Sequence, residues 1–358
     1  MTAQPSAPVG GCRAWRDALL HLGEYQRAAR CRSKLPKGDI DCRPLNFARF
    51  AVSRRAVQPS SRWTRSTACQ KSPMINSLVL GFAAIAWVYA ATVSCAFAQT
   101  AAAPQEIPTD AGKTIWITTT QRLKTKVYEN EKLSASPVLV VVLHGDSPER
   151  PPTYQYRFAQ AVAVAVPDTV VAAVLRPGYD DGEERSDGMR GETTGDNYTP
   201  EVLDAVATAI SELKTRYRPR GVILVGHSGG SAIVGSLIGQ RAGIANAALL
   251  VSCPCDLGAW REHMHATKGG KIWERPVRSL SPLALIGGIS ASTRVSMLVG
   301  SDDQTTPPSL TNAYAAALQD RGVPVDATIA PGLGHNMLLA PVTMDRLKQI
   351  VSTFGPAQ

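Results

Sequence analysis

A short glycine-rich stretch, GHSGG at residues 226–230, holds the residue best suited to nucleophilic chemistry. It follows the branched apolar run 222–225, so Ser228 is expected on a sharp turn between a buried strand and a helix. Such a turn exposes the serine hydroxyl for attack on a carbonyl carbon, and its glycines let neighbouring backbones approach closely. The motif alone is weak evidence for a nucleophile, because a Gly/Ser turn used only for packing can have the same sequence. The interpretation therefore depends on partners elsewhere in the chain.

A serine nucleophile needs a general base and a group that orients this base, and two later segments supply candidates. Asp302 and Asp303 follow the apolar run 294–299, and either carboxylate could hold an imidazole in the required tautomer. His335 lies 32 residues after Asp303, beyond the next strand-like segment, and would act as the base. The plainer alternatives are a carboxylate that caps the helix starting near Pro307 and a solvated loop histidine. The chain order Ser, Asp, His favours catalysis.

A fourth segment could stabilise the negative charge that develops on an attacked carbonyl oxygen. HGDS, at residues 144–147, follows the apolar run 138–143. The backbone N–H groups of Asp146 and Gly229 are expected to form an oxyanion hole together. Ser147 stays open as an alternative donor to Asp146. His227, beside the nucleophile, is expected to orient the turn rather than to act as a base.

These segments can meet only if the elements before them lie side by side in one sheet. Five apolar, β-branched runs are typical of parallel strands buried on both faces. They span residues 137–143, 168–175, 221–225, 246–253 and 294–300. Two strands at 114–120 and 125–130 are expected before them, a strand at 325–331 after them, and helices at 199–217, after Ser228, at 309–322 and near 341–354. This alternation predicts an α/β fold: a mostly parallel central sheet with helices on both faces and at most a short cap from residues 256–293. Reactive groups would then collect at the carboxyl edge of the sheet.

The N-terminal part of the chain differs from the rest in charge. Residues 1–98 hold 14 Lys and Arg against 4 Asp and Glu, whereas residues 99–358 hold 24 against 25. The formal net charge of +9 therefore belongs to the N-terminal part, which argues against nucleic-acid binding by the whole chain.

Residues 74–98 join an apolar run to a final Ala-Phe-Ala, the small-x-small pattern of a cleaved secretory signal. We expect a periplasmic or secreted protein without a stable membrane span after cleavage; the alternative is a membrane-spanning helix. Residues 1–73 are expected to be a disordered basic extension, or upstream sequence translated from too early a start codon. A linker over residues 99–112 then leads to a single catalytic domain, residues 113–358.

The chain resembles the α/β-hydrolase superfamily over roughly residues 114–356, through LHGD, GHSGG, GSDD and GLGH in the family's chain order. Its C-terminal part looks further like the catalytic domains of prolyl-oligopeptidase-type peptidases and related esterases, although the sequence carries no propeller ahead of it. The resemblance implies a triad of Ser228, Asp303 and His335. Asp303 is preferred over Asp302 because the family commonly places the acid three residues after the glycine that ends the strand. No cofactor and no metal are implied.

The leading functional hypothesis is hydrolysis of small carboxylic esters through an acyl-enzyme on Ser228. The first alternative is an exported peptidase that releases small N-terminal residues, in which Glu183, Glu184 or Asp187 would anchor the substrate amine. The second is a non-catalytic binding protein on the same scaffold. The charged loop 179–198 is either a solvated connection or a mobile rim over the pocket. The oligomeric state does not follow from the sequence.

Two remaining pairs of residues are interpreted as structural. Cys253 and Cys255 are expected to be small buried residues that close a strand, because a disulfide across one residue would be strained. His263 and His265 are expected to be solvated helix residues rather than metal ligands, because no third ligand has matching spacing.

Overall fold

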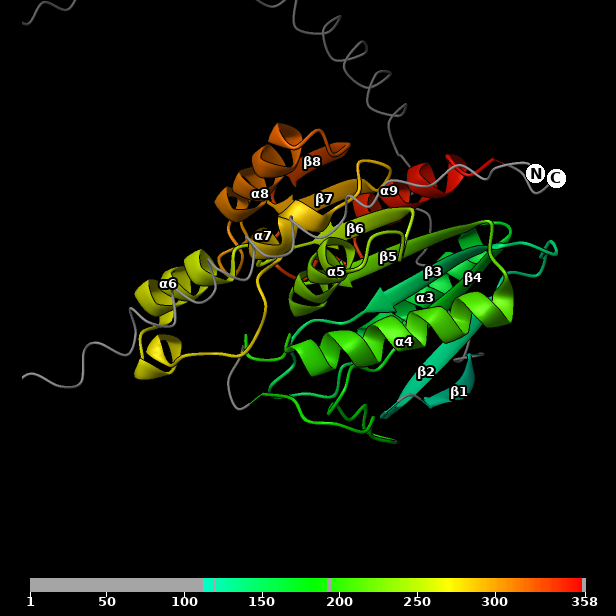
Figure 1. The fold of residues 1–358 in the computed structure, drawn as a ribbon, viewed down its shortest axis with the longest axis horizontal. Helices are drawn as coiled ribbons and strands as arrows, with labels where there is room; N and C mark the ends of the chain where they lie inside the picture. Colours follow the sequence, from blue (N-terminus) through cyan, green and yellow to red (C-terminus); the bar gives the residue numbers. More distant parts are fainter. Residues whose placement is uncertain (1–111, 119, 192–194, 356–358) are drawn as a thin grey trace, which may run out of the picture. The chain divides into compact units, whose positions relative to one another are not determined.

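A computed structural model describes residues 112–118, 120–191 and 195–355. Within these residues lies an eight-stranded sheet of order β1-β2-β4-β3-β5-β6-β7-β8 (Figure 1). The pairs β1·β2 and β2·β4 are antiparallel, and the other five pairs are parallel. The strands are β1 (Lys113–Thr118), β2 (Arg122–Glu129), β3 (Val138–Leu143), β4 (Thr169–Val174), β5 (Gly221–His227), β6 (Ala247–Val251), β7 (Arg294–Gly300) and β8 (Val325–Ala330).

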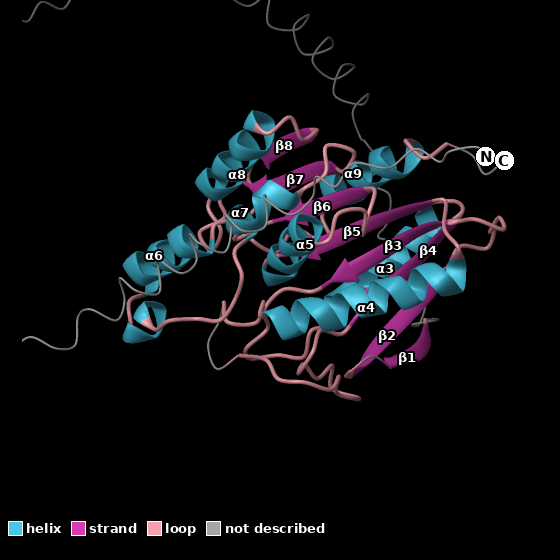
Figure 2. Cartoon of the chain, in the orientation of Figure 1, coloured by secondary structure: helices cyan, strands magenta, loops and turns pink. Residues whose placement is uncertain are grey.

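Helices cover both faces of this sheet (Figure 2). On one face, α3 (Tyr154–Ala165) and α9 (Pro341–Ser352) contribute to one hydrophobic cluster. On the other face, α4 (Pro200–Tyr217), α5 (Gly229–Gln240) and α8 (Pro308–Asp320) contribute to a second cluster. The predicted fold class, a mostly parallel sheet between two layers of helices, is confirmed. None of the helices in the described part is both long enough and apolar enough to cross a membrane.

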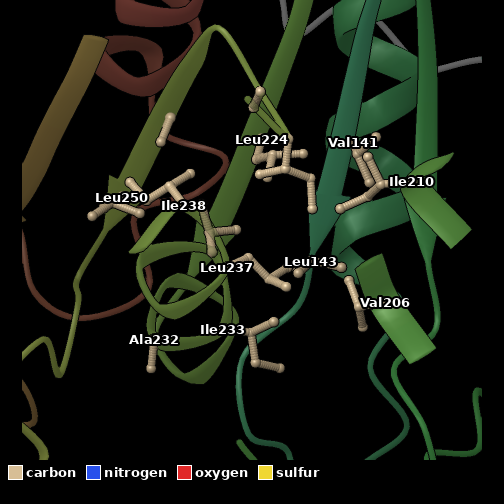
Figure 3. Packing of buried hydrophobic residues seen from close by; sticks show 14 of the residues in the cluster. Val141, Leu143, Val206, Ile210, Leu224, Ala232, Ile233, Leu237, Ile238 and Leu250 are labelled. Atoms are coloured by element: carbon tan, nitrogen blue, oxygen red, sulfur yellow. The ribbon is translucent and has the colours of Figure 1, made fainter. Parts of the chain in front are cut away.

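The central strands form because their residues are buried on both faces. Every residue of β3, β4 and β5 is buried, which explains why these runs are continuous rather than alternating in hydrophobicity. In Figure 3, Leu143 and Leu224 of the sheet lie between Ile210 of α4 and Leu237 of α5. Large-to-small substitutions at such positions typically cost about 2–5 kcal/mol, so this layer contributes strongly to the stability of the sheet that carries the site.

Residues 256–293 form the expected short excursion rather than a separate domain. They contain α6 (Leu257–Lys268), the short helix α7 (Pro282–Leu285), and two single turns of 3₁₀ helix, η1 (Lys271–Glu274) and η2 (Ile286–Gly288). The excursion is tied to the preceding loop, because Ser279 Oγ accepts a hydrogen bond from Tyr198 N at 2.9 Å and Leu280 N donates to the Tyr198 carbonyl at 2.9 Å. The two segments therefore support each other.

The sequence interpretation missed one helix. α3 lies between β3 and β4, where no element was expected, and buries Tyr156, Phe158 and Val162 against the sheet. Its C-terminal half, AVAVA, alternates small and β-branched residues, a pattern that carries little helical periodicity. The need of two parallel strands for a crossover connection was the signal that could have found it.

A second difference concerns the cysteines. Cys253 and Cys255 are fully buried, as expected, but they form a disulfide, so the expectation of two unlinked residues is wrong. The bridge forms beyond the end of β6, where the Cα atoms of the two cysteines lie 5.1 Å apart, within the range that a disulfide spans. The segments predicted as basic extension and signal peptide, and the linker up to residue 111, lie outside the described residues.

Candidate active site

The four polar segments meet at the carboxyl edge of the parallel strands. HGDS follows β3, Ser228 follows β5, Asp303 follows β7, and His335 follows β8. β3 and β5 are direct neighbours, with Leu143 paired in register with Gly226, so the HGDS segment and the serine turn leave the sheet together. The topology thus gathers residues that are up to 191 positions apart in the chain.

Ser228 lies on a strained turn between β5 and α5. Its backbone has φ of 53° and ψ of −121°, a conformation that side chains rarely adopt. The turn depends on two glycines. A Cβ on Gly230 would lie 2.3 Å from the Leu143 carbonyl oxygen, and one on Gly226 would lie 2.5 Å from the Gly230 carbonyl. The strain and these contacts explain why the serine stands between glycines.

The structure brings Ser228, His335 and Asp303 into one line of hydrogen bonds. The Ser228 Oγ lies 3.0 Å from His335 Nε2, and His335 Nδ1 lies 2.9 Å from the nearer oxygen of Asp303. Since a carboxylate only accepts, Nδ1 carries the proton and Nε2 is left to accept the serine proton. Asp302, the alternative acid, is exposed, and its carboxylate accepts from the Ser301 hydroxyl at 2.7 Å. The orienting position is therefore occupied by Asp303.

Asp303 is buried but well supplied with donors. Its carboxylate accepts from the backbone N–H groups of Thr305 and Thr306 at 2.9 and 2.8 Å and from the Thr306 hydroxyl at 2.8 Å. Burial alone would raise its pKa, but the hydrogen bond and charge of His335 and the Thr306 donors outweigh burial and lower the pKa to about 2. The acid therefore stays ionised across the neutral range and can stabilise an imidazolium.

The side chain of Asp146 lies against the backbone of Gly229, the two residues expected to supply the oxyanion hole. A Cβ on Gly229 would lie 2.5 Å from the Asp146 carboxylate, so no larger residue fits between them. Gly145, next to Asp146, is equally close to the nucleophile, because a Cβ there would lie 2.9 Å from Ser228 Cβ. The HGDS segment thus lies close to the serine turn, and an oxyanion hole formed by the N–H groups of Asp146 and Gly229 stays a prediction.

A buried arginine beneath this segment was not found from the sequence. The Asp146 carboxylate accepts from Arg176 Nη1 at 3.1 Å, from Tyr198 Oη at 2.7 Å, from Tyr179 Oη at 3.3 Å and from Gly195 N at 3.1 Å. Arg176 is fully buried, and burial raises the pKa of Tyr198 well above its usual value. Asp146 therefore fastens the HGDS segment to β4 and to the loop 179–198. That loop is therefore fastened to the HGDS segment by side chains, and its role as a mobile rim over the pocket stays a prediction.

His227 links the two loops that flank the serine. The Gly145 N–H donates to Tyr154 Oη at 2.6 Å, the hydroxyl pairs with His227 Nδ1 at 2.8 Å, and His227 Nε2 donates to the His335 carbonyl at 2.9 Å. The carbonyl can only accept, so the proton sits on Nε2 and Tyr154 donates to Nδ1. Burial lowers the pKa of His227 to about 4, which keeps the ring neutral beside His335. As expected from the sequence, this histidine orients rather than acts as base; Tyr154 was not foreseen.

The acidic residues of the loop 179–198 are engaged elsewhere. Lys124 Nζ lies 3.1 Å from Glu183 and 3.0 Å from Glu184, and Arg122 lies 3.2 Å from Asp187. Each of these carboxylates thus already has a cationic partner within the chain. The two helix histidines also have partners: His263 bonds the Gln304 carbonyl and His265 bonds Glu274. Over the described ranges, no cluster of three or more His, Cys, Asp or Glu could hold a metal ion.

Comparison with known proteins agrees with this geometry. Residues 140–286 match the model of the alpha/beta hydrolase family. Among solved structures, the esterase Pf2001 of Pyrococcus furiosus matches with a TM-score of 0.52 and 16% identity, over 70% of this chain and 92% of that one. Est1E of Butyrivibrio proteoclasticus with bound ferulic acid matches with 0.50 and 13%, over 67% and 97%.

A peptidase is similar to the same degree. The acylaminoacyl peptidase of Pyrococcus horikoshii matches with a TM-score of 0.51 and 14% identity, over 68% of this chain and 41% of the peptidase. No curated protein matches the chain in sequence. At these identities the solved structures establish only the fold. They include both esterases and a peptidase, so they do not distinguish ester from peptide substrates.

Proposed function

Because the chain contains a domain of the alpha/beta hydrolase family, we propose that it is a serine hydrolase that cleaves carboxylic esters through an acyl-enzyme on Ser228. The observation that carries this proposal is the single line of hydrogen bonds from the Ser228 hydroxyl through His335 to the buried carboxylate of Asp303. A scaffold that only bound ligands would have no need for a strained serine held in contact with a polarised imidazole.

The reaction follows from these contacts. His335 Nε2 accepts the Ser228 proton while the serine oxygen bonds to the ester carbonyl carbon. The resulting oxyanion is held by the backbone N–H groups of Gly229 and Asp146. The imidazolium then donates its proton to the departing alcohol as the ester C–O bond breaks. Water repeats the sequence on the acyl-enzyme, with His335 as base, and releases the carboxylic acid.

Ester cleavage is favoured over release of N-terminal residues by the state of the loop carboxylates. A peptidase of that type must bind the substrate ammonium with a carboxylate that has no other cationic partner. Glu183 and Glu184 share Lys124 with the buried Asp181, and Asp187 is paired with Arg122, so each of these candidates already has a cationic partner. Peptide cleavage remains the second candidate because the peptidase of Pyrococcus horikoshii shares the fold.

The proposal is tested by following 4-nitrophenyl butanoate hydrolysis in the wild-type full chain and in Ser228→Ala. Loss of the nucleophile should lower kcat by several orders of magnitude, because the residual rate comes only from binding and the oxyanion hole. A fluorophosphonate probe should label the wild type at Ser228 and leave the variant unlabelled. Ser352→Ala is the matched control, because Ser352 is an exposed serine in the last turn of α9. Full turnover by folded Ser228→Ala protein would exclude this mechanism.

A panel of aminoacyl anilides run beside the ester separates the two substrate classes. Cleavage of anilides with kcat/KM above that of the ester would favour the peptidase. Absence of both activities and of labelling, in a folded protein, would favour a binding protein.

We also propose that the protein is exported to the periplasm or the medium after cleavage behind Ala98. This rests on the apolar run and the Ala-Phe-Ala ending of residues 74–98, which lie outside the described residues. N-terminal sequencing of the mature protein should start at Gln99; a mature protein that still contains residues 74–98 would contradict it.

A further inference from the structure

Resting on the ester hydrolysis proposed above, we propose that the substrate carries a carboxylate, which Arg150 binds at the rim of a cavity close to Ser228. The proposal names a substrate class for the same site. It rests on the position of the cavity, on its lining and on the distribution of charge around it.

The cavity has a volume of about 350 Å³ and adjoins the reacting groups. Its lining includes His227, which directly precedes Ser228, and Asn336, which directly follows His335. Tyr154, whose hydroxyl holds the Gly145 N–H at 2.6 Å, forms another part of the wall. Gly145 lies between this wall and the nucleophile, because a Cβ on it would lie 3.1 Å from Tyr154 Oη and 2.9 Å from Ser228 Cβ. A group that enters this cavity is therefore close to the serine turn and to the HGDS segment.

The lining combines apolar and polar side chains with a single charge. Pro151, Leu338 and Leu339 supply apolar surface, and the polar part of the lining comes from Ser147, Thr153, Tyr154, His227 and Asn336. Among the lining residues only Arg150 is charged near neutral pH, because burial keeps the pKa of His227 at about 4. A short substrate group that ends in an anion matches a partly apolar lining with one positive charge.

Arg150 is available for such an anion. It forms no ion pair with any described residue, whereas Arg176, Arg122 and several other arginines of the domain are paired with carboxylates. Its backbone is held in place, because the Ser147 hydroxyl donates to the Arg150 carbonyl. The side chain is therefore presented from an ordered loop, and its guanidinium can bind a carboxylate through two N–H groups.

A neighbouring cavity strengthens the positive potential at this loop. It shares Ser147, Arg150 and Pro151 with the first cavity and adds Arg185 and Arg190. Arg190 Nη1 donates to the Ser147 carbonyl at 3.1 Å, so this second guanidinium lies against the same loop. Glu149 and Asp180 also line the neighbouring cavity and offset two of the three positive charges there. The charged residues that line the two cavities therefore have a positive net charge, which favours binding of an anion.

The same lining disfavours a substrate ammonium. No carboxylate lines the cavity beside Ser228, so a free peptide N-terminus would meet Arg150 without a compensating negative charge. Preference for a carboxylate therefore predicts the opposite of what an aminopeptidase needs, and the two can be distinguished with matched substrates.

The test uses two pairs of esters in which the only change is methylation of a carboxylate. 4-Nitrophenyl hydrogen glutarate and its methyl ester carry the group on the acyl side. 4-(Butanoyloxy)benzoate and its methyl ester carry it on the alcohol side. In one of the two pairs, the wild-type full chain should show a kcat/KM about tenfold higher for the free carboxylate, as expected for one favourable charge pair. Raising NaCl from 50 to 500 mM should reduce this ratio.

Arg150→Gln should remove most of that ratio, by lowering kcat/KM for the carboxylate ester about tenfold more than for its methyl ester. Arg157→Gln is the matched control, because Arg157 is an exposed arginine on α3 outside this cavity and should leave the ratio at the wild-type value. A ratio of one or less in both pairs, or a ratio that survives Arg150→Gln, overturns the inference. An equal loss in Arg157→Gln also overturns it, since a general field would then explain the preference.

Failure of the proposed function has a different signature. If the folded wild type hydrolysed none of the four esters, ester hydrolysis itself would be wrong. If it hydrolysed the methyl esters at least as well as the free carboxylates, ester hydrolysis would stand and only the carboxylate subsite would be lost.

Discussion

Replacing Asp303 by asparagine should abolish most of the activity without leaving a cavity at position 303. One carboxylate oxygen accepts the backbone N–H groups of Thr305 and Thr306 at 2.9 and 2.8 Å, and the other accepts the Thr306 hydroxyl and His335 Nδ1–H. If the asparagine turned its NH₂ toward the two backbone N–H groups, two donors would face it. The NH₂ is therefore expected to point toward His335.

An NH₂ at that position reverses the tautomer of His335. Nδ1 must become an acceptor, so the proton moves to Nε2, which lies 3.0 Å from the Ser228 hydroxyl and can no longer accept its proton. In the serine-protease triad the same change lowers kcat about 10⁴-fold, and that factor corresponds to about 5.5 kcal/mol of transition-state stabilisation. We expect a loss of similar size here.

The assay is kcat and KM for 4-nitrophenyl butanoate between pH 6 and 9, with thermal unfolding to show that each variant is folded. KM should change little, because the substrate does not contact Asp303. Asp302→Asn is the matched control and should stay within twofold of wild type, since Asp302 is exposed and bonds to Ser301. A folded Asp303→Asn protein with more than a tenth of the wild-type kcat would refute the tautomer argument.

Three further predictions concern the stability of the site. Asp303 has a folded pKa of about 2 against an ordinary value of 3.8, so its ionised form should contribute about 2 kcal/mol to the free energy of unfolding. This contribution is fully present above pH 4 and is lost as the pH falls toward 2. Urea unfolding of the wild type and of Asp303→Asn at several pH values should therefore show the steeper loss of stability in acid for the wild type. Arg176→Met leaves the Asp146 carboxylate buried without its cation and should lower the free energy of unfolding in urea by about 3–5 kcal/mol. A double variant that also carries Asp146→Asn should recover part of this loss. A single variant as stable as the wild type would contradict the pairing. Gly230→Ala places a Cβ 2.3 Å from the Leu143 carbonyl and should cost about 1–3 kcal/mol along with most activity, whereas Gly287→Ala, with no atom nearby, should change stability by less than about 0.5 kcal/mol.

The sequence was sufficient for the features that local patterning encodes. Strands such as β3 and β5 are buried on both faces, and this burial requires uninterrupted apolar runs that are visible in the letters alone. The turn at Ser228 was likewise visible, because two backbone approaches leave no room for a side chain and so demand glycine. α3 escaped notice because its Ala-Val alternation hides the helical period, and only the crossover between parallel strands requires it.

The tertiary structure decided which polar groups meet. Asp302 and Asp303 are adjacent in sequence with the same chemistry, and only the path of the chain beyond β7 turns Asp303 toward His335. The same holds for Arg176 beneath Asp146 and for Tyr154 against His227, which join residues 30 and 73 positions apart. Such pairs depend on strand order and on the directions in which loops leave the sheet. Those properties arise from packing of the whole domain, so no window of the sequence contains them.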